Sequence, residues 1–411
     1  MRLPLRRGQG RRRRAALHRA ALRPSRRTAK EPALVRLFGA LRRGRFIERP
    51  NRFVVVCEVG GRRSSAYLPN PGRLSELLHP GAALLLEESP GKRHPFTAVA
   101  VERDGTPVML HTHRTNDAAA HLIAEGLVPG FEGARILERE VRFGRSRFDL
   151  LVERRGRRTV VEVKSCTLFG RRAALFPDAV TERGARHVEE LAALARDGLD
   201  AAVLFIVGSP GLECFLPDYH TDPAFAAALC RARTKVDVVA CAVSYGADLT
   251  LEAETRRLPV AWSVVERENV DSGAYLAVAR VERETTVEPG GLAPLRLSKG
   301  FYVYAGAAPA GLDAAVRGLR PLRKRLRSPF DHLRAVSTLR AALAVRTPED
   351  SMACMLARGL RALSDRPVPG FGPGRCPCAS HLFFFEKDPM NSPSFHDMLI
   401  HMRIERHLRE P

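Results

Sequence analysis

The sequence has few aromatic residues and no long apolar run. Aromatic residues make up 6% of the 411 residues, and tryptophan occurs once. No apolar run approaches the roughly 20 residues of a membrane-spanning helix. The first residues are basic rather than apolar, unlike a secretion signal. We therefore expect a cytoplasmic protein with no membrane partner, in which most aromatic rings belong to cores.

Cysteine is also too sparse for a disulfide framework. Eight cysteines are scattered along the chain, whereas proteins that depend on disulfides are usually small and rich in cysteine. The sequence therefore predicts reduced thiols, which suits the cytoplasm.

Acidic residues are the third shortage. The chain has 67 Lys and Arg against 45 Asp and Glu, which gives a net charge of +22. A surplus of this size is typical of proteins that bind a polyanion, and nucleic acid is the first candidate partner.

More than half of that surplus lies in residues 1–30, which hold 11 arginines, one lysine and no acidic residue. Blocks of like charge do not fold alone. We expect a disordered basic tail, or a segment added by a translation start set too far upstream. The alternative is a dedicated nucleic-acid arm.

The rest of the chain divides into three units by its hydrophobic pattern. Residues 31–112 contain several short apolar runs between Gly and Pro clusters, which predicts a small β-barrel. Residues 113–255 alternate helical and strand-like patterns, which predicts an α/β domain. A third unit, residues 256–387, begins with new strand-like runs, and residues 388–411 read as a polar C-terminal tail.

A β-hairpin is predicted over residues 147–165, where two alternating apolar runs flank a short basic turn with one Gly. One face of this hairpin pairs Phe148 with Val163 and Leu150 with Val161, which suits a core.

The other face of the hairpin carries charge. With Arg155-Gly156 at the centre of the turn, Asp149 lies directly opposite Glu162, and Lys164 shares their face. Like charges opposed across a strand pair destabilise it, and a divalent metal with oxygen ligands relieves the repulsion. The alternative is a hairpin whose charges are simply solvated.

These residues predict a phosphodiesterase site in which Asp149 and Glu162 hold Mg²⁺ or Mn²⁺. Lys164 would orient a water molecule or stabilise charge on the phosphate. Glu140, on the preceding predicted strand, offers a further carboxylate for the metal, and Arg147 lies where a phosphate backbone could approach.

Five ordered blocks between about residues 35 and 250 resemble the sugar fermentation stimulation protein A (SfsA) family. The blocks are Arg49–Phe53, Leu68–Leu74, Ser146–Asp149, Val161–Leu168 and Phe176–His187. The resemblance implies an OB-fold-like barrel followed by a PD-(D/E)XK nuclease-like domain, with a DNA-binding or nuclease role. It also implies that Asp149, Glu162 and Lys164 form the catalytic pattern.

Two blocks depart from the family's pattern. Phe148 replaces the Pro of the superfamily signature, a Pro that is often missing. The block Leu68–Arg73 reads Leu-Pro-Asn-Pro-Gly-Arg, where the family usually has Cys-Pro-Asn-Thr-Gly-Arg.

The last block has two interpretations. In one, Thr181 or Asp178 caps the following helix. In the other, which we favour because the block directly follows the hairpin, Arg183, Arg186 and His187 face the scissile phosphate. We also expect Arg73 to contact nucleic acid. Phe53 and Tyr67 of the barrel are candidates for stacking on bases.

The third unit resembles a GIY-YIG nuclease fold through Gly273–Tyr275 and Tyr302–Gly306. Residues 273–385 resemble more closely a GIY-YIG-like family of unknown function that is sometimes fused to SfsA. The C-terminal blocks that carry this resemblance are Val368–Gly372, Cys376–Cys378 and Ser380–Phe385.

Catalytic groups of the GIY-YIG pattern are missing. Ala315 stands where the pattern has Arg, and the helix that should offer a metal-binding Glu reads Ala353-Cys354-Met355. Tyr275 and Tyr302 then lack catalytic partners, so we expect this domain to be inactive as a nuclease. Its basic stretch, residues 317–327, either contacts phosphates or is a solvated helix face.

Cys376, Cys378 and His381 invite a zinc interpretation. They supply three ligands, but the fourth that a structural zinc site needs is not evident nearby in the sequence. We therefore expect a turn without metal.

Taken together, the residues and the resemblance predict a Mg²⁺- or Mn²⁺-dependent nuclease acting on DNA or RNA. The alternative is a regulatory protein that binds DNA without cleaving it. A scaffold whose basic surface binds acidic proteins has no specific support in the sequence.

Overall fold

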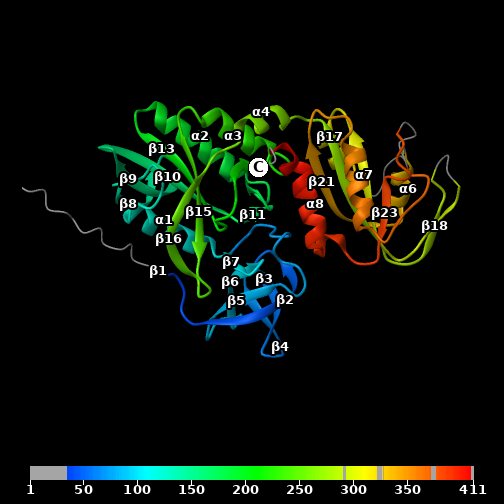
Figure 1. The fold of residues 1–411 in the computed structure, drawn as a ribbon, viewed down its shortest axis with the longest axis horizontal. Coiled ribbons are helices and arrows are strands. Elements are labelled where there is room, and N and C mark those ends of the chain that lie inside the picture. Colours follow the sequence, from blue (N-terminus) through cyan, green and yellow to red (C-terminus); the bar gives the residue numbers. More distant parts are fainter. Residues whose placement is uncertain (1–34, 290–292, 322–325, 327, 372–375, 409–411) are drawn as a thin grey trace, which may run out of the picture. The chain divides into compact units, whose positions relative to one another are not determined.

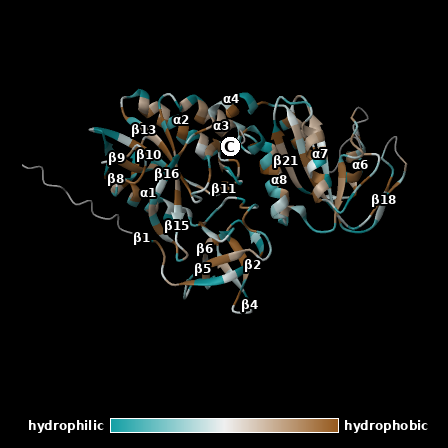
Figure 2. Ribbon diagram, in the orientation of Figure 1, coloured by the Kyte–Doolittle hydropathy of each residue, from teal (hydrophilic) through white to brown (hydrophobic). Residues whose placement is uncertain are grey.

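The computed structural model describes residues 35–289, 293–321, 326, 328–371 and 376–408, and Figure 1 shows the elements they form. The basic segment 1–30 lies outside the described residues. Within them, no helix is long and apolar enough to cross a membrane. Figure 2 shows hydrophobic and hydrophilic residues mixed along most elements, as expected for strands and helices with one buried face.

The first domain is a barrel of short strands. The sheet order is β4-β3-β2-β5-β6-β7, and a further pairing of β4 with β6 closes five of these strands on themselves. This confirms the predicted OB-like barrel. The strands are β2 (Leu41–Asn51), β3 (Val54–Val59), β4 (Arg62–Tyr67), β5 (Ala83–Glu88), β6 (Phe96–Arg103) and β7 (Thr106–Met109).

The second domain is built on a seven-stranded mixed sheet of order β1-β16-β15-β13-β10-β9-β8. Its central strands β10, β13 and β15 are parallel. Both faces of such strands are covered, so β13 is almost wholly apolar, whereas β10 also carries the polar residues Glu162 and Lys164. The strands are β1 (Val35–Arg36), β8 (Arg135–Phe143), β9 (Ser146–Arg154), β10 (Arg157–Cys166), β13 (Asp200–Val207), β15 (Asp237–Tyr245) and β16 (Thr250–Leu258).

Helices cover both faces of this sheet. Helix α1 (Thr112–Ala124) packs Leu122 and Ile123 into one core, while α2 (Glu182–Arg196) and α3 (Pro223–Ala232) contribute to the other. The domain is completed by a small sheet and a short helix, namely β11 (Leu168–Phe169), β12 (Ala173–Phe176), β14 (Cys214–Pro217) and α4 (Trp262–Glu268).

The third domain has an antiparallel sheet of order β21-β17-β20-β23-β22. Its strands are β17 (Gly273–Val281), β20 (Gly300–Ala308), β21 (Thr338–Arg346), β22 (Arg366–Pro367) and β23 (Leu382–Phe385). Around it lie β18 (Thr285–Val287), β19 (Leu295–Leu297), α5 (Leu312–Arg317), α6 (Pro329–Ala335), α7 (Met352–Leu363), η1 (Pro389–Asn391), α8 (Pro393–Arg403) and η2 (Glu405–His407).

The structure corrects three predicted boundaries. The unit 31–112 is not a single domain, because β1 pairs with β16 in the sheet of the second domain. The boundary at 255 falls inside β16, which continues to Leu258. The predicted tail 388–411 is not separate over its described part, residues 388–408, because α8 buries Phe395 and Leu399 against α7.

Replacing Phe395 tests whether α8 is integral to the third domain. Phe395 is 1% exposed, and deleting a buried Phe side chain costs about 3–5 kcal/mol. We expect Phe395→Ala to lower the free energy of unfolding of this domain by that amount in urea denaturation. The matched control is Ser394→Ala, an exposed position on the same helix. Equal stability of the two variants would contradict the assignment.

Candidate active site

The predicted hairpin is present with the predicted register. Strands β9 and β10 pair from Arg154 with Arg157 as far as Leu150 with Val161. The two turn residues, Arg155 and Gly156, have φ angles of 53° and 73°. Positive φ at both central residues is typical of a type I′ turn, whose twist matches that of the two strands it joins.

Beyond Leu150 the ladder between β9 and β10 stops, just before the carboxylates. The expected pairing of Phe148 with Val163 on one face is wrong. Phe148 packs in the core that contains α2, with its ring 5.4 Å from that of His187, whereas Val163 belongs to the core that contains α1. The backbone N–H of Val163 instead donates to the Asp149 side chain, at 2.7 Å.

Asp149 is held by two donors. Its Oδ2 accepts from Val163, and its Oδ1 accepts from the Nδ2 of Asn116 on α1, at 2.7 Å. Burial, and then the negative charge of Glu162, raise the pKa of Asp149 to about 6. Asp149 and Glu162 are therefore close enough to repel one another in a poorly solvated site.

Glu162 is 5% exposed, and its two oxygens have different surroundings. Oε1 accepts hydrogen bonds from Lys164 and from Nδ1 of His187, the latter at 2.7 Å. Oε2 is buried and has no hydrogen-bond partner among the described residues. Burial raises the pKa of Glu162, but His187 and Lys164 outweigh it and lower the pKa overall. Glu162 is thus an ionised carboxylate with one free oxygen.

His187 lies on the buried face of helix α2, where its side chain reaches Glu162. Arg183 donates from Nε to Nε2 of His187, at 3.3 Å. Since arginine can only donate, Nε2 is the acceptor, and Nδ1 carries the proton given to Glu162. His187 is 2% exposed and its Nδ1 contacts Glu162. It therefore does not lie at the surface facing a phosphate, which was the interpretation favoured from the sequence.

The remaining residues of this block have separate roles. Thr181 caps α2 by accepting from the N–H of Gly184, at 3.0 Å. Arg183 is exposed above His187, and Arg186 is also exposed, with Glu190 at 3.9 Å. The Thr181 cap agrees with the capping interpretation, while phosphate contact by Arg183 and Arg186 stays a prediction.

Glu140 and Arg147 lie beside the hairpin on β8 and β9. Their side chains form an ion pair, with 2.8 Å between Arg147 Nε and Glu140 Oε2, and each is about half exposed. Glu140 adopts a φ of 60°, and its charge contributes to raising the pKa of Asp149. Arg147 remains accessible from solvent.

Asp178 does not cap α2, contrary to one interpretation of its block. It accepts from the N–H of Leu74, at 3.2 Å, and a side chain at position 72 would clash with it, because an added Cβ would lie 2.2 Å from its Oδ2. Gly72 is therefore required by close packing. Two blocks distant in sequence meet at this contact.

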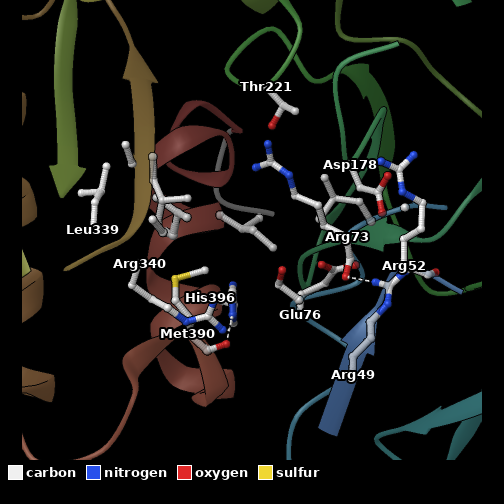
Figure 3. Close-up of a pocket in the computed structure, with 18 of the residues that line it drawn as sticks. Arg49, Arg52, Arg73, Glu76, Asp178, Thr221, Leu339, Arg340, Met390 and His396 are labelled. Atoms are coloured by element: carbon white, nitrogen blue, oxygen red, sulfur yellow. Dashed lines mark hydrogen bonds between the residues drawn. The ribbon is translucent and has the colours of Figure 1, made fainter. Parts of the chain in front are cut away.

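A second buried carboxylate, Glu76, lies beside Asp178. Burial, and then the charge of Asp178, raise the pKa of Glu76 to about 8. Arg49 donates to the carbonyl oxygens of Arg52, Asn70 and Arg73. Figure 3 shows these side chains along one wall of a cavity: Arg49, Arg52, Arg73, Glu76 and Asp178.

The barrel exposes the two aromatic residues that were singled out for stacking. Phe53 and Tyr67 are each 42% exposed. They are close along the backbone, since the N–H of Leu68 donates to the carbonyl of Phe53 at 2.8 Å. Arg73 is exposed as well. These three side chains are available to a ligand at the surface.

The GIY-YIG-like positions lie on the sheet and helices of the third domain. Tyr275 on β17 is paired with Gly306 on β20, while Tyr302 is 2% exposed and donates to the carbonyl of Ser298. Ala315 lies on α5, and Ala353 is buried on α7. Helix α5 ends at Arg317, so a helix face over residues 317–327 is not seen; residues 322–325 and 327 of that stretch are outside the described part.

Asn116 is the site residue that sequence reasoning missed. It lies on α1, far from the hairpin in sequence, and a single Asn in a helical pattern carries no signal of its own. Only the packing of α1 against β10 brings its amide to Asp149.

Three family models match the chain. They are the SfsA N-terminal OB domain over residues 47–110, the sugar fermentation stimulation protein RE domain over 113–248, and a domain of unknown function, DUF123, over 274–404. They confirm the resemblances and the order of the three domains.

Relatives are similar to the first two domains. A sugar fermentation stimulation protein homolog of Methanothermobacter thermautotrophicus is 45% identical over 192 residues, covering 46% of this chain and 80% of the relative. One from Natranaerobius thermophilus is 38% identical over 225 residues, covering 53% and 92%. The solved structure of Pyrococcus furiosus SfsA in complex with Ca²⁺ is 32% identical, with a TM-score of 0.51, and covers 56% of this chain and 98% of that one.

The raised pKa of Asp149 makes a prediction about stability without metal. A carboxyl group whose pKa is higher in the folded than in the unfolded state destabilises the fold as pH rises between the two values. We expect the stability of Asp149→Asn relative to wild type, in EDTA, to increase by about 2–3 kcal/mol from pH 4 to pH 7. Denaturant unfolding at a series of pH values measures this difference.

Asp117→Asn is the matched control. Burial raises the pKa of Asp117, but ion pairs with Arg139 and Arg114 lower it overall. Its contribution is therefore complete above pH 4, and the difference from wild type should be flat over the same range. A flat profile for Asp149→Asn as well would contradict the repulsion between Asp149 and Glu162.

Proposed function

We propose that this chain, which belongs to the sugar fermentation stimulation protein A family, is a metal-dependent nuclease that hydrolyses phosphodiester bonds. The observation that carries the proposal is a buried carboxylate, Glu162, and a partly buried one, Asp149, beside a lysine. Among the described residues, Glu162 Oε2 is buried without a partner, while Asp149 nearby has a raised pKa. A protein that only binds an anion gains nothing from two such carboxylates.

The donor set fits a hard divalent cation. Asp149 and Glu162 offer carboxylate oxygens, and Glu140 is a third candidate, as Mg²⁺ and Mn²⁺ prefer. The Ca²⁺ in the structure of the Pyrococcus furiosus relative supports a divalent site in this family. Bound there, Mg²⁺ or Mn²⁺ supplies charge neutralisation at the phosphate and a water molecule of lowered pKa.

The protein's own residues prepare the reaction by position and charge. Asn116 and the Val163 N–H fix the Asp149 carboxylate, and His187 fixes that of Glu162. Lys164 uses one N–H on Glu162. Its other N–H groups can orient the attacking water or donate to a phosphate oxygen as negative charge grows there.

The nucleic-acid partner is proposed from charge and from the barrel. Arg147 and Arg183 are accessible around the carboxylates and suit phosphate contacts that position the backbone. Phe53 and Tyr67 are exposed on an OB-type barrel, a fold whose strands and loops bind oligonucleotides. The alternative, a regulatory protein that binds DNA without cleaving it, is supported by the barrel surface with Phe53 and Tyr67 but does not account for the carboxylates.

Cleavage assays on Asp149→Ala and Lys164→Ala separate the two functions. We expect purified wild type to cut labelled DNA or RNA with Mg²⁺ or Mn²⁺ and not with EDTA. Each variant should lose on the order of 10²–10³-fold in rate, because its group acts on the transition state. Nucleic-acid affinity in a filter-binding assay should remain within a few fold of wild type.

The control for these variants is Glu153→Ala, an exposed carboxylate on the same hairpin that is ion-paired with Arg135. It should cleave at the wild-type rate. Metal-dependent cleavage that survives both Asp149→Ala and Lys164→Ala would refute the site. Tight, salt-sensitive binding without cleavage under any metal would favour the regulatory alternative.

Metal affinity tests the positioning role of His187 independently of cleavage. Loss of a group that orients a metal ligand typically costs 10–100-fold in affinity. We expect this loss of Mn²⁺ affinity for His187→Leu, measured by calorimetry. His187→Asn should recover most of it, because its amide nitrogen can take the place of Nδ1. Equal affinities for the two variants would show that His187 only fills the core.

A further inference from the structure

A cluster of thiols and one imidazole lies in the third domain, apart from the carboxylate site. The ligand atoms of Cys354, Cys376, Cys378 and His381 all lie within 4.8 Å of one another. His381 Nε2 is 3.4 Å from the Sγ of Cys376 and 3.8 Å from the Sγ of Cys354. Four donors of the two kinds that zinc prefers therefore converge on one point.

The spacing is that of a tetrahedral zinc site. With Zn–S bonds of about 2.3 Å and Zn–N bonds of about 2.0–2.1 Å, ligand atoms lie about 3.5–3.8 Å apart. The two measured N···S distances fall close to this range. A hydrogen bond from a thiol to the imidazole would bring only two of these groups together, whereas a shared metal ion explains why all four converge.

The imidazole of His381 is fixed with the correct nitrogen toward the sulfurs. Its Nδ1 lies 2.9 Å from the carbonyl oxygen of Ala305, on β20, and a carbonyl can only accept. The proton is therefore on Nδ1, and the lone pair of Nε2 points to the cluster. A backbone carbonyl that orients a histidine in this way is typical of metal sites. His381 itself is 1% exposed.

The sequence interpretation lacked one ligand, and the fold supplies it. Cys376, Cys378 and His381 come from the segment just before β23, whereas Cys354 comes from the first turn of α7. The fourth ligand was not visible because it lies on a helix well upstream. The expectation of a turn without metal was based on that missing ligand.

We propose that Cys354, Cys376, Cys378 and His381 bind one structural Zn²⁺ ion. Three thiolates and one imidazole close the coordination sphere, so this is a structural site and not a catalytic one. The ion would tie the segment before β23 to helix α7 and, through Ala305, to the central strand β20. The proposal is independent of the nuclease function, which lies in another domain.

Zinc content of the full chain tests the proposal. The protein is purified without a histidine tag, under reducing conditions, and its metal is measured by mass spectrometry. We expect one zinc per chain in wild type and in Asp149→Ala, and less than about one tenth in Cys376→Ser/Cys378→Ser, which leaves too few ligands for a closed site. Cys230→Ser, a thiol outside the cluster, is the matched control and should keep its zinc.

Two results would overturn the proposal: wild type that takes up no zinc after incubation with ZnCl₂, or full zinc content in the double variant. If the double variant fails to fold, Co²⁺ loaded into wild type decides. A tetrahedral thiolate site gives strong sulfur-to-cobalt charge-transfer absorption, and zinc should displace it. A weak octahedral spectrum would contradict the assignment.

Discussion

Repulsion between two carboxylates in a poorly solvated hairpin is the constraint on which the candidate site depends. The turn at Arg155-Gly156 sets a register that brings Asp149 and Glu162 to the same place at the end of the paired stretch. The fold does not remove this repulsion with a dedicated arginine. Glu162 Oε2 has no hydrogen-bond partner among the described residues. Asp149 is held by two uncharged donors, the side-chain amide of Asn116 and the backbone N–H of Val163, which do not neutralise its charge. A bound cation is the simplest way to stabilise that arrangement.

Helices on both faces of the sheet hold the two carboxylates in place. Helix α1 contributes Asn116 to Asp149, and α2 contributes His187 to Glu162. Each helix packs its apolar side into a separate core, so the carboxylates are held between two rigid layers. Such preorganisation lets fixed groups act on developing charge without rearrangement.

Local signals in the sequence predicted much of this, and long-range contacts limited the rest. The register of the hairpin could be predicted from Arg155-Gly156, because placing a two-residue turn there fixes which residues of the two strands pair. Alternation failed at Phe148, because the ladder ends after Leu150 and the strand no longer keeps its period of two. Strand β2 has no apolar run that would signal it, because only one of its eleven residues is buried. Asn116 and Cys354 gave no local signal, since their roles arise only where a helix meets a distant segment.

The third domain lacks the charged groups of the GIY-YIG pattern but brings a different set of candidate metal ligands together. The Arg and Glu of the GIY-YIG pattern are replaced by Ala315 and Ala353, while the neighbouring Cys354 lies among Cys376, Cys378 and His381. Soft thiolates suit zinc, whereas the carboxylates of the second domain suit hard cations. The two proposals thus assign a structural metal site and a catalytic one to different domains by ligand type.

The most direct test of the account is to locate bound Mn²⁺ by anomalous diffraction from crystals of the full chain. The account predicts a peak within coordination distance, roughly 2.0–2.3 Å, of one oxygen of Asp149 and of Glu162 Oε2. Well-ordered crystals soaked in Mn²⁺ that show no peak there, with Glu162 Oε2 still unpartnered, would contradict it.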